Sequence, residues 1–126
     1  MQRVVDSAAQ LTESDRGCIA VTGSHGGLSA ARYALVAMPW LVVFNDAGVG
    51  KDNAGLAGLP LLAQHSVAAA TVAHTSARIG EAASTLADGI ISHVNPLAQA
   101  LGLAPGMALA TWLHSTAAAS RSNAPS

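Results

Sequence analysis

The sequence predicts a small three-layer α/β/α sandwich around a mainly parallel, Rossmann-like sheet of about four strands. Short apolar runs rich in β-branched residues alternate with segments of helical spacing, in the order β-α-β-α-β-α-β-α. The clearest run, residues 40–44, is apolar on both faces, as a parallel strand covered by helices would be. The 126 residues contain no long linker, so residues 17–119 are expected to form one domain.

Each expected strand is short and ends at a polar or glycine residue. The first stops at Gly23, the second at Asn45 and the third at His74. Right-handed crossovers would place the carboxyl ends of all the strands on one edge of the sheet. The expected strands are residues 18–22, 40–44, 67–73 and 90–94.

Helices are expected between the strands and after the last one. In the first of them Leu28 and Leu35 have helical spacing, and Pro39 ends the segment. The second contains Pro60, which predicts a kink or a split because proline inside a helix costs about 3 kcal/mol. Gly89 closes the third. The expected helices are residues 28–38, 54–65, 80–87, 96–101 and 107–119.

The two ends of the chain differ from the rest. Residues 1–16 mix charged and polar side chains, so they are expected to be a polar lead-in that can hold a helical turn, and they do not resemble a signal peptide. Residues 120–126 are rich in Ser, Asn and Pro, which predicts a disordered tail.

Charge is scarce along the whole chain. Only 10% of residues are charged, against about 25% in an ordinary soluble domain, so we expect part of the neutral surface to be buried in a homo-oligomer. The alternative is a monomer with an Ala/Ser/Thr-rich exterior. The net charge of −1 and the scattered basic residues argue against nucleic-acid binding. No apolar stretch reaches the roughly 18 residues of a membrane span.

The single cysteine, Cys18, rules out a disulfide within the chain. It lies in an apolar run, which favours a buried structural thiol over a nucleophile. Together with the absence of a signal peptide, this composition predicts a cytoplasmic protein.

Polar residues follow every expected strand at its carboxyl end. In open α/β sheets ligands bind at that edge, so the agreement among four strands predicts a site for a small anionic or polar molecule. Four of the seven charges between Gly17 and Ala100 fall in two of these clusters. The clusters are residues 22–27, 45–52, 74–78 and 93–95.

The first cluster combines a glycine turn with the start of a helix. Gly26 and Gly27 can expose backbone N–H groups beside the helix N-terminus, an arrangement that binds anions. His25 is a candidate general acid or base, and Ser24 a candidate nucleophile or hydrogen-bond donor. The alternative is a turn that only joins strand to helix. The pattern is neither G-x-G-x-x-G nor a P-loop.

The second cluster carries most of the candidate chemistry. Asp46 is a candidate acid–base carboxylate, and Lys51, the only lysine in the chain, a candidate electrophile or base. The alternative is an ion pair between them that holds the loop. Asn45 would contact the ligand, and Asp52 is expected to cap the helix that follows.

The last two clusters would supply ligand contacts. Arg78 suits a carboxylate or phosphate, although it can instead pair with Asp46, Asp52 or Glu81. Ser76 adds a hydroxyl. His93 and Asn95 are expected to reach the same edge from the fourth strand.

Metal binding is not expected. The candidate ligands are Asp46 with three histidines, but no two of those histidines have the short spacing of an HxH or HxxxH pair. The three are His25, His74 and His93.

These residues predict an acid–base enzyme without an organic cofactor, a hydrolase or isomerase of a small carboxylate or amide. The alternatives are a non-catalytic metabolite-binding or accessory subunit, and a purely structural role for the polar clusters. The candidate catalytic residues are His25, Asp46 and Lys51, and the candidate binding residues are Ser24, Gly26, Gly27, Asn45, Ser76, Arg78, His93 and Asn95.

Overall fold

Five strands form one sheet in the order β1-β2-β3-β4-β5, with helices on both faces. The computed structural model describes the backbone of residues 2–123 and the side chains of residues 2–116. The expected α/β sandwich with a mostly parallel sheet is confirmed, with one strand more than expected. The strands are β1 Gln2–Val5, β2 Ile19–His25, β3 Leu41–Asn45, β4 Ala68–Val72 and β5 Ile91–Val94. The α-helices are α1 Leu28–Ala37, α2 Gly58–Gln64, α3 Ala82–Asp88, α4 Pro96–Ala100 and α5 Leu109–Asn123. Three 3-10 helices complete the fold, η1 Ala8–Gln10, η2 Glu13–Asp15 and η3 Lys51–Leu56.

The extra strand lies in the expected lead-in. Strand β1 pairs in parallel with β2, with Gln2 opposite Ile19. Arg3 then forms an ion pair with the buried carboxylate of Asp15 at 2.9 Å, which ties the edge strand to η2. Four residues with two polar side chains are too short a pattern to predict a strand, so these contacts explain why the segment joins the sheet.

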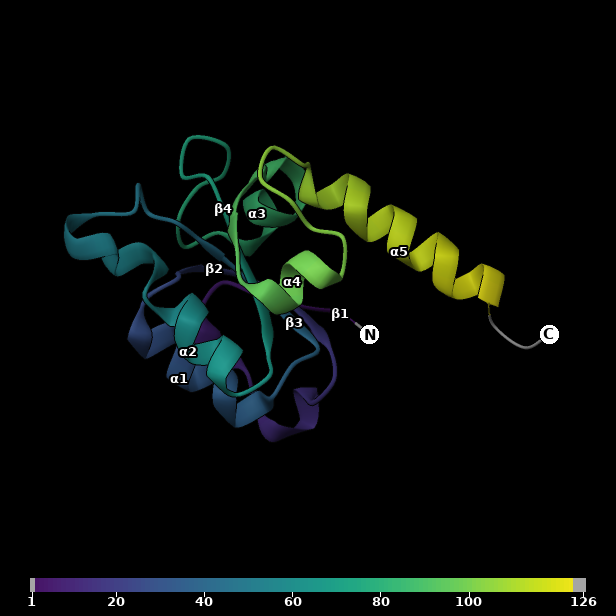
Figure 1. The fold of residues 1–126 in the computed structure, drawn as a ribbon, viewed down its shortest axis with the longest axis horizontal. Coiled ribbons are helices and arrows are strands. Elements are labelled where there is room, and N and C mark those ends of the chain that lie inside the picture. Colours follow the sequence, from purple (N-terminus) through teal and green to yellow (C-terminus); the bar gives the residue numbers. More distant parts are fainter. Residues whose placement is uncertain (1, 124–126) are drawn as a thin grey trace.

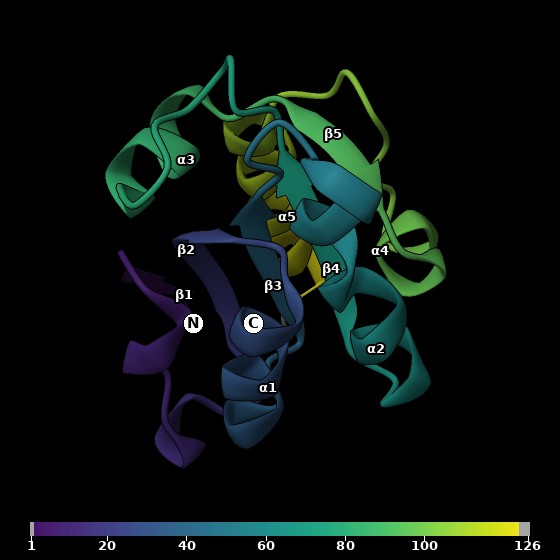
Figure 2. The same ribbon diagram turned by 90° about the vertical axis from the view of Figure 1, so that its left-hand side faces the viewer.

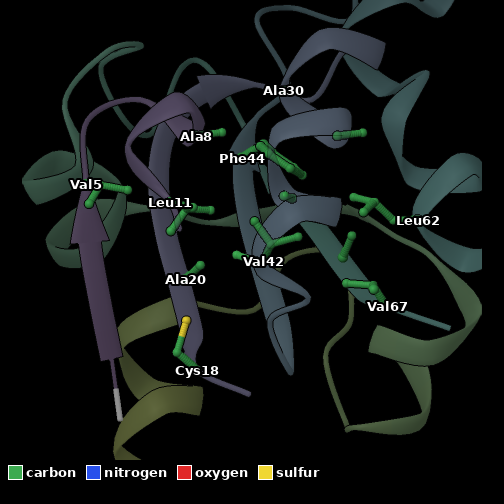
Figure 3. Packing of buried hydrophobic residues seen from close by; sticks show 14 of the residues in the cluster. Val5, Ala8, Leu11, Cys18, Ala20, Ala30, Val42, Phe44, Leu62 and Val67 are labelled. Carbon is green, nitrogen blue, oxygen red and sulfur yellow. The ribbon is translucent and has the colours of Figure 1, made fainter. Parts of the chain in front are cut away.

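Each face of the sheet has its own core, because side chains alternate along the buried strands. Val42 and Phe44 of β3 pack against η1, α1 and α2, as Figure 3 shows for that side of the sheet. Leu41 and Val43 point the other way, toward the elements after β4. Figure 2 looks at the molecule with α1 and α2 in front of the sheet and α5 behind it.

The first four strands follow one another in the sheet in chain order. All three connections between them contribute to the same core, so they pass over the same face. The parallel part of the sheet therefore has no point at which the strand order reverses, the feature that creates the binding crevice of a Rossmann fold.

Strand β5 runs antiparallel to β4, which corrects the expectation that all carboxyl ends share an edge. The chain leaves β4 and returns to β5 at the same edge, because the Ala73 N–H donates to the Ile90 carbonyl at 2.8 Å. Residues 91 and 92 consequently lie at the carboxyl edge of the other strands, and the far end of β5 points away from it.

The expected helix over residues 54–65 is split at Ala57 into η3 and α2. Pro60 falls in the first turn of α2, where a backbone N–H has no partner within the helix, so it does not break the helix. The start of α2 packs closely on the start of α1. A Cβ on Gly58 would lie 2.7 Å from the Gly27 carbonyl oxygen and 2.9 Å from Cβ of Ala31, so only glycine fits there.

Helix α5 packs its first turns through Leu109, Trp112 and Leu113 and then runs outward from the rest of the fold (Figure 1). The indole of Trp112 stacks on Trp40, with ring centroids 6.4 Å apart. The expected tail falls partly on this helix, which extends to Asn123, and residues 124–126 lie outside the described part of the chain. None of the described helices is long and apolar enough to cross a bilayer.

Candidate functional site

The first three polar clusters meet at the carboxyl edge. His25 at the end of β2 is opposite Asn45 at the end of β3. The Asp46 N–H donates to the Val72 carbonyl at 2.9 Å, which brings the second cluster against the end of β4. Neighbouring parallel strands thus deliver these segments side by side, as the sequence predicts.

The central feature of this edge is a pair formed by Asp46 and His74. Asp46 follows β3 directly and is only 4% exposed. Its Oδ1 accepts the backbone N–H of Gly48 at 2.8 Å and that of His74 at 3.0 Å. The same oxygen lies 3.3 Å from Nδ1 of His74, whose side chain is 54% exposed. A buried carboxylate therefore holds one nitrogen of an accessible imidazole.

The pKa of the Asp46 carboxyl is lowered below its ordinary value. Burial alone would raise this pKa, but hydrogen bonds from Gly48, Ser92 and His74 stabilise the ionised form and outweigh it. Asp46 is therefore ionised at neutral pH and does not donate a proton there. Its geometry also suits the orientation of His74. The acid–base role expected of Asp46 itself stays a prediction.

The sequence alone does not identify His74 as an acid–base candidate. It places His74 at a strand end, where it is a candidate metal ligand only. The signal that could have identified it was its position after β4, next in the sheet to the strand that Asp46 follows, since adjacent strand ends lie within reach of each other.

His25 is exposed and lies between two small hollows at the same edge. One, of about 150 Å³, opens toward η1 and α1. The other, of about 200 Å³, opens toward the loop after β3. The first is lined by Ser7, Ser24, His25, Ser29, Ala30 and Tyr33, and the second by His25, Ala47, Val49, Gly50, Ala54 and Gly55.

The loop after β3 has an unusual backbone. From residue 47 to residue 53, only Lys51 lacks a positive φ. Ala47 has a φ of 53° and the β-branched Val49 one of 69°, a conformation that disfavours any residue with a Cβ. Hydrogen bonds from the Val49 N–H to the Asp46 carbonyl and from the Gly55 N–H to the Val49 carbonyl, both 2.7 Å, hold the loop in place. Conformations of this kind cluster at functional sites.

Lys51 and Asp52 lie on this loop and are both exposed. Within residues 2–116 no carboxylate lies within 4 Å of Lys51, so the described structure contains no ion pair between it and Asp46. The expected capping role of Asp52 is wrong, because Asp52 lies inside η3 with a φ of 56° and α2 begins six residues later, at Gly58.

Two residues of the first cluster use their polar groups inside the fold. Ser24 Oγ accepts the Ala8 N–H at 2.8 Å and so anchors η1. The Gly26 N–H donates to the Asn45 carbonyl at 3.0 Å, which removes it from an anion cradle. Gly27 is the N-cap of α1 and is buried where that helix meets α2.

Asn45 and Ser76 are also structural. The Asn45 amide is fully buried, donates to the Ala77 carbonyl at 3.0 Å and accepts the Ala47 N–H at 2.8 Å. Ser76 Oγ donates to the Ala73 carbonyl at 2.7 Å and accepts the Ile90 N–H at 2.9 Å. The ligand contacts expected of both residues are corrected, because their hydrogen bonds lock the loops around β4.

Arg78 remains accessible. Its side chain is 81% exposed, and the nearest carboxylate oxygen, that of Glu81, is 4.0 Å away. An exposed pair at this distance holds the guanidinium weakly. The alternative ion pair with Asp46 is not formed among the described residues, since the Asp46 carboxylate faces His74.

His93 and Asn95 do not reach the carboxyl edge, since β5 is antiparallel. Asn95 is buried at the start of β4, where its amide donates to the carbonyls of Leu59 and Val67. His93 lines a separate groove of about 520 Å³ between α2 and the end of β5. The same reversal brings Ser92 to the edge, where its Oγ lies 2.8 Å from Oγ1 of Thr71.

The described residues contain no group of three or more His, Cys, Asp or Glu side chains placed to hold a metal ion. Cys18 is buried, as expected. Burial raises the pKa of its thiol, as does the nearby Asp15 carboxylate, so the thiolate form is disfavoured.

Comparison with known proteins adds no relative from which a role could be transferred. The chain matches no protein-family model, and no curated protein or solved structure shows significant similarity to it.

Proposed function

We propose that the carboxyl edge binds a small anionic or polar molecule and that His74, oriented by Asp46, is its acid–base group. The observation that carries this proposal is the pair itself, a buried carboxylate at 3.3 Å from Nδ1 of a half-exposed histidine. A carboxylate in this position favours the imidazole tautomer with its proton on Nδ1. The Nε2 lone pair is then unprotonated, and on this half-exposed side chain it can take a proton from a bound molecule.

The chemistry that fits this pair is hydrolysis or isomerisation of a small carboxylate or amide. When Nε2 accepts a proton, the adjacent Asp46 carboxylate stabilises the imidazolium that forms. His25 is a second histidine at the same edge and is exposed. Lys51 and Arg78 are the exposed cations of the two neighbouring loops and would attract the anionic part of the substrate.

The space beside His25, at the same edge as His74, is small, although His74 itself lines neither hollow. The two hollows beside His25 are each smaller than the roughly 300 Å³ at the lower end of ordinary ligand pockets. A molecule of a few heavy atoms fits such a space, whereas a nucleotide does not. We therefore propose a small acid or amide as the substrate.

The first test measures the thermal stability of the purified protein against small carboxylates, phosphates and amides. A ligand at 100 times its dissociation constant should stabilise the protein by about 2.7 kcal/mol. Lys51→Ala and Arg78→Ala should lose this stabilisation and still unfold at the wild-type temperature, because neither side chain has a close partner in the described structure. His114→Ala, on the exposed surface of α5, is the matched control. If no compound stabilises the wild type, the proposal is wrong.

Turnover is tested with the compounds that bind. His74→Ala should reduce kcat by about 100-fold or more, the usual contribution of a general base, with little change in binding. Normal turnover by folded His74→Ala protein would show that another group acts as the base. Binding without any turnover in the wild type would favour the alternative, a non-catalytic metabolite-binding subunit.

One observation favours an assembly in either case. Leu28, Tyr33 and Val36 are large apolar side chains exposed on α1. In a chain with so few charges, such a surface suits contact with a second copy. The mass in solution tests this part of the proposal, and a monomeric mass at working concentration would contradict it.

A further inference from the structure

The groove beside the end of β5 has the size of a small-molecule pocket. Its volume of about 520 Å³ falls within the range of ordinary ligand pockets, about 300–1,000 Å³. It is lined by residues from the end of η3, from α2 and from the segment where β5 passes into α4. The apolar residues of this lining are Leu56, Leu59, Pro60, Ala63, Val94 and Pro96.

The walls of the groove are held together by Asn95, which also lines it. The Asn95 amide donates to the Leu59 carbonyl of α2 at 3.2 Å and to the Val67 carbonyl at 2.9 Å. Its oxygen accepts the N–H groups of Ala69 and Ala98. These four bonds fix α2 beside the end of β5 and use the full hydrogen-bonding capacity of the amide, so Asn95 shapes the groove and leaves no polar group for a ligand.

His93 lines the same groove and has a hydrogen bond unmade. Its Nδ1 is buried and has no hydrogen-bond partner among the described residues. A neutral imidazole carries one proton, and a proton on Nδ1 would be a buried donor without an acceptor. Buried donors are left unpaired less often than buried acceptors. We therefore expect the proton of the neutral ring on Nε2.

This tautomer makes His93 a hydrogen-bond donor to the groove. The residue is half-buried, and since Nδ1 is covered, the nitrogen left for a ligand is Nε2. Gln64, the remaining polar residue of the lining, is exposed and can bond water. A single donor in an otherwise apolar groove suits a ligand with a single acceptor.

The groove favours a ligand without charge. No Asp, Glu, Lys or Arg is among the residues that line it, so a charged group would lose its water without gaining a counter-ion from these residue types. A carbonyl oxygen suits the donor of His93 because it only accepts, whereas a hydroxyl brings a proton that needs an acceptor of its own.

We infer that this groove is a second binding site, for a small neutral apolar molecule whose carbonyl oxygen accepts the Nε2 proton of His93. The walls are already formed, the volume is sufficient, and the lining supplies one free polar group. The site lies where β5 ends, away from the edge that carries Asp46 and His74, and does not depend on the function proposed for that edge.

The test compares three probes of similar shape by NMR of the nitrogen-15-labelled protein at about pH 8, where an ordinary histidine is neutral. Acetophenone has the carbonyl, α-methylstyrene has a methylene group in place of the oxygen, and benzoate is charged. Acetophenone should shift the Ala63 and Val94 resonances to saturation and bind about three- to tenfold more tightly than α-methylstyrene, the contribution of one hydrogen bond. Benzoate should bind most weakly. The His93 ring of the free protein should carry its proton on Nε2.

Substitutions separate the donor from the shape of the groove. His93→Phe keeps a planar ring and should bind acetophenone and α-methylstyrene equally. His93→Gln has an amide N–H donor close to the position of Nε2 and should keep the preference for acetophenone. Ala63→Leu fills the groove from α2 and should weaken the binding of all three probes. His65→Ala, at the exposed end of the same helix, is the control and should bind like the wild type.

Binding of a carbonyl compound in this groove is refuted if acetophenone leaves the groove resonances unshifted, if benzoate binds best, or if folded His93→Phe still prefers acetophenone to α-methylstyrene. If His93→Phe does not fold, unchanged acetophenone binding by Ala63→Leu refutes it. Groove resonances that shift on dilution without a probe would assign the groove to contact with a second copy of the chain instead. These measurements report on the groove alone, so their failure is distinguishable from failure of the function proposed for the carboxyl edge.

Discussion

Replacing Asn95 with alanine should destabilise the protein by about 4 kcal/mol, since each of the four hydrogen bonds of its side chain contributes about 1 kcal/mol. The amide donates to the carbonyls of Val67 at 2.9 Å and Leu59 at 3.2 Å. Its oxygen accepts the N–H groups of Ala69 at 3.1 Å and Ala98 at 3.0 Å. One buried side chain thereby joins β4, α2 and the start of α4.

Equilibrium unfolding in urea measures this loss, with an unchanged m-value as the sign that folding remains two-state. Gln99→Ala, on the exposed side of the same helix, is the control and should change stability by less than about 0.5 kcal/mol. The N-cap of α4 alone is worth about 1 kcal/mol. A loss no larger than that would refute the idea that the four bonds act together.

Three further outcomes are expected. The pKa of Asp46 is lowered in the folded protein, so its contribution to stability is complete above the unfolded pKa and is lost as the pH falls through the folded one. Urea midpoints measured below about pH 4 should therefore depend less on pH in Asp46→Asn than in the wild type, and identical slopes would count against the assignment. Ala47→Gly should raise the free energy of unfolding by about 1 kcal/mol, because the φ of 53° strains a residue with a Cβ. Ala87→Gly, at an exposed position of α3, is the control and should lower the free energy of unfolding by about 0.5–1 kcal/mol. A decrease in both variants would show that the backbone of Ala47 is not strained. Cys18 should react with a thiol reagent only after unfolding, and rapid labelling of the native protein would contradict its burial.

Local patterns were sufficient to predict most of the fold. The apolar runs around Val21, Val43, Ala70 and Ile91 all became strands, because burial on two faces leaves a continuous apolar signal. The second helical segment is split, as expected, but at Ala57, and Pro60 lies in the first turn of α2 without breaking it. Strand β1 could not be predicted, because its residues show no such apolar pattern. Its place in the sheet depends on pairing with β2.

The part of the candidate site that lies at the ends of parallel strands could be predicted from the sequence. The ends of β2, β3 and β4 do meet, which brings the segments of His25, Asp46 and His74 to one edge. The direction of β5 could not be read from the sequence, since an apolar run has the same pattern in both orientations. Because β5 runs antiparallel, Ser92 lies at the carboxyl edge where Asn95 was expected.

The hydrogen-bond partners of the polar side chains could not be predicted from the sequence either. Ser24, Asn45 and Ser76 have the side chains that a ligand site needs, but a sequence pattern cannot show whether their partners lie inside the fold. The structure assigns all three to backbone groups of neighbouring loops. Lys51 and Arg78, in contrast, are exposed and have few partners in the described part of the chain.

The division of the two cores along the chain has a consequence for synthesis on the ribosome. Residues up to 69 complete the face that carries α1 and α2, whereas the other face is covered only by segments from residue 77 onward. A nascent chain that has emerged as far as β4 must therefore present Leu41, Val43 and Ala70 to solvent until Leu109 and Trp112 leave the exit tunnel. During that interval the half-covered sheet is a target for chaperones and a point at which incomplete chains aggregate.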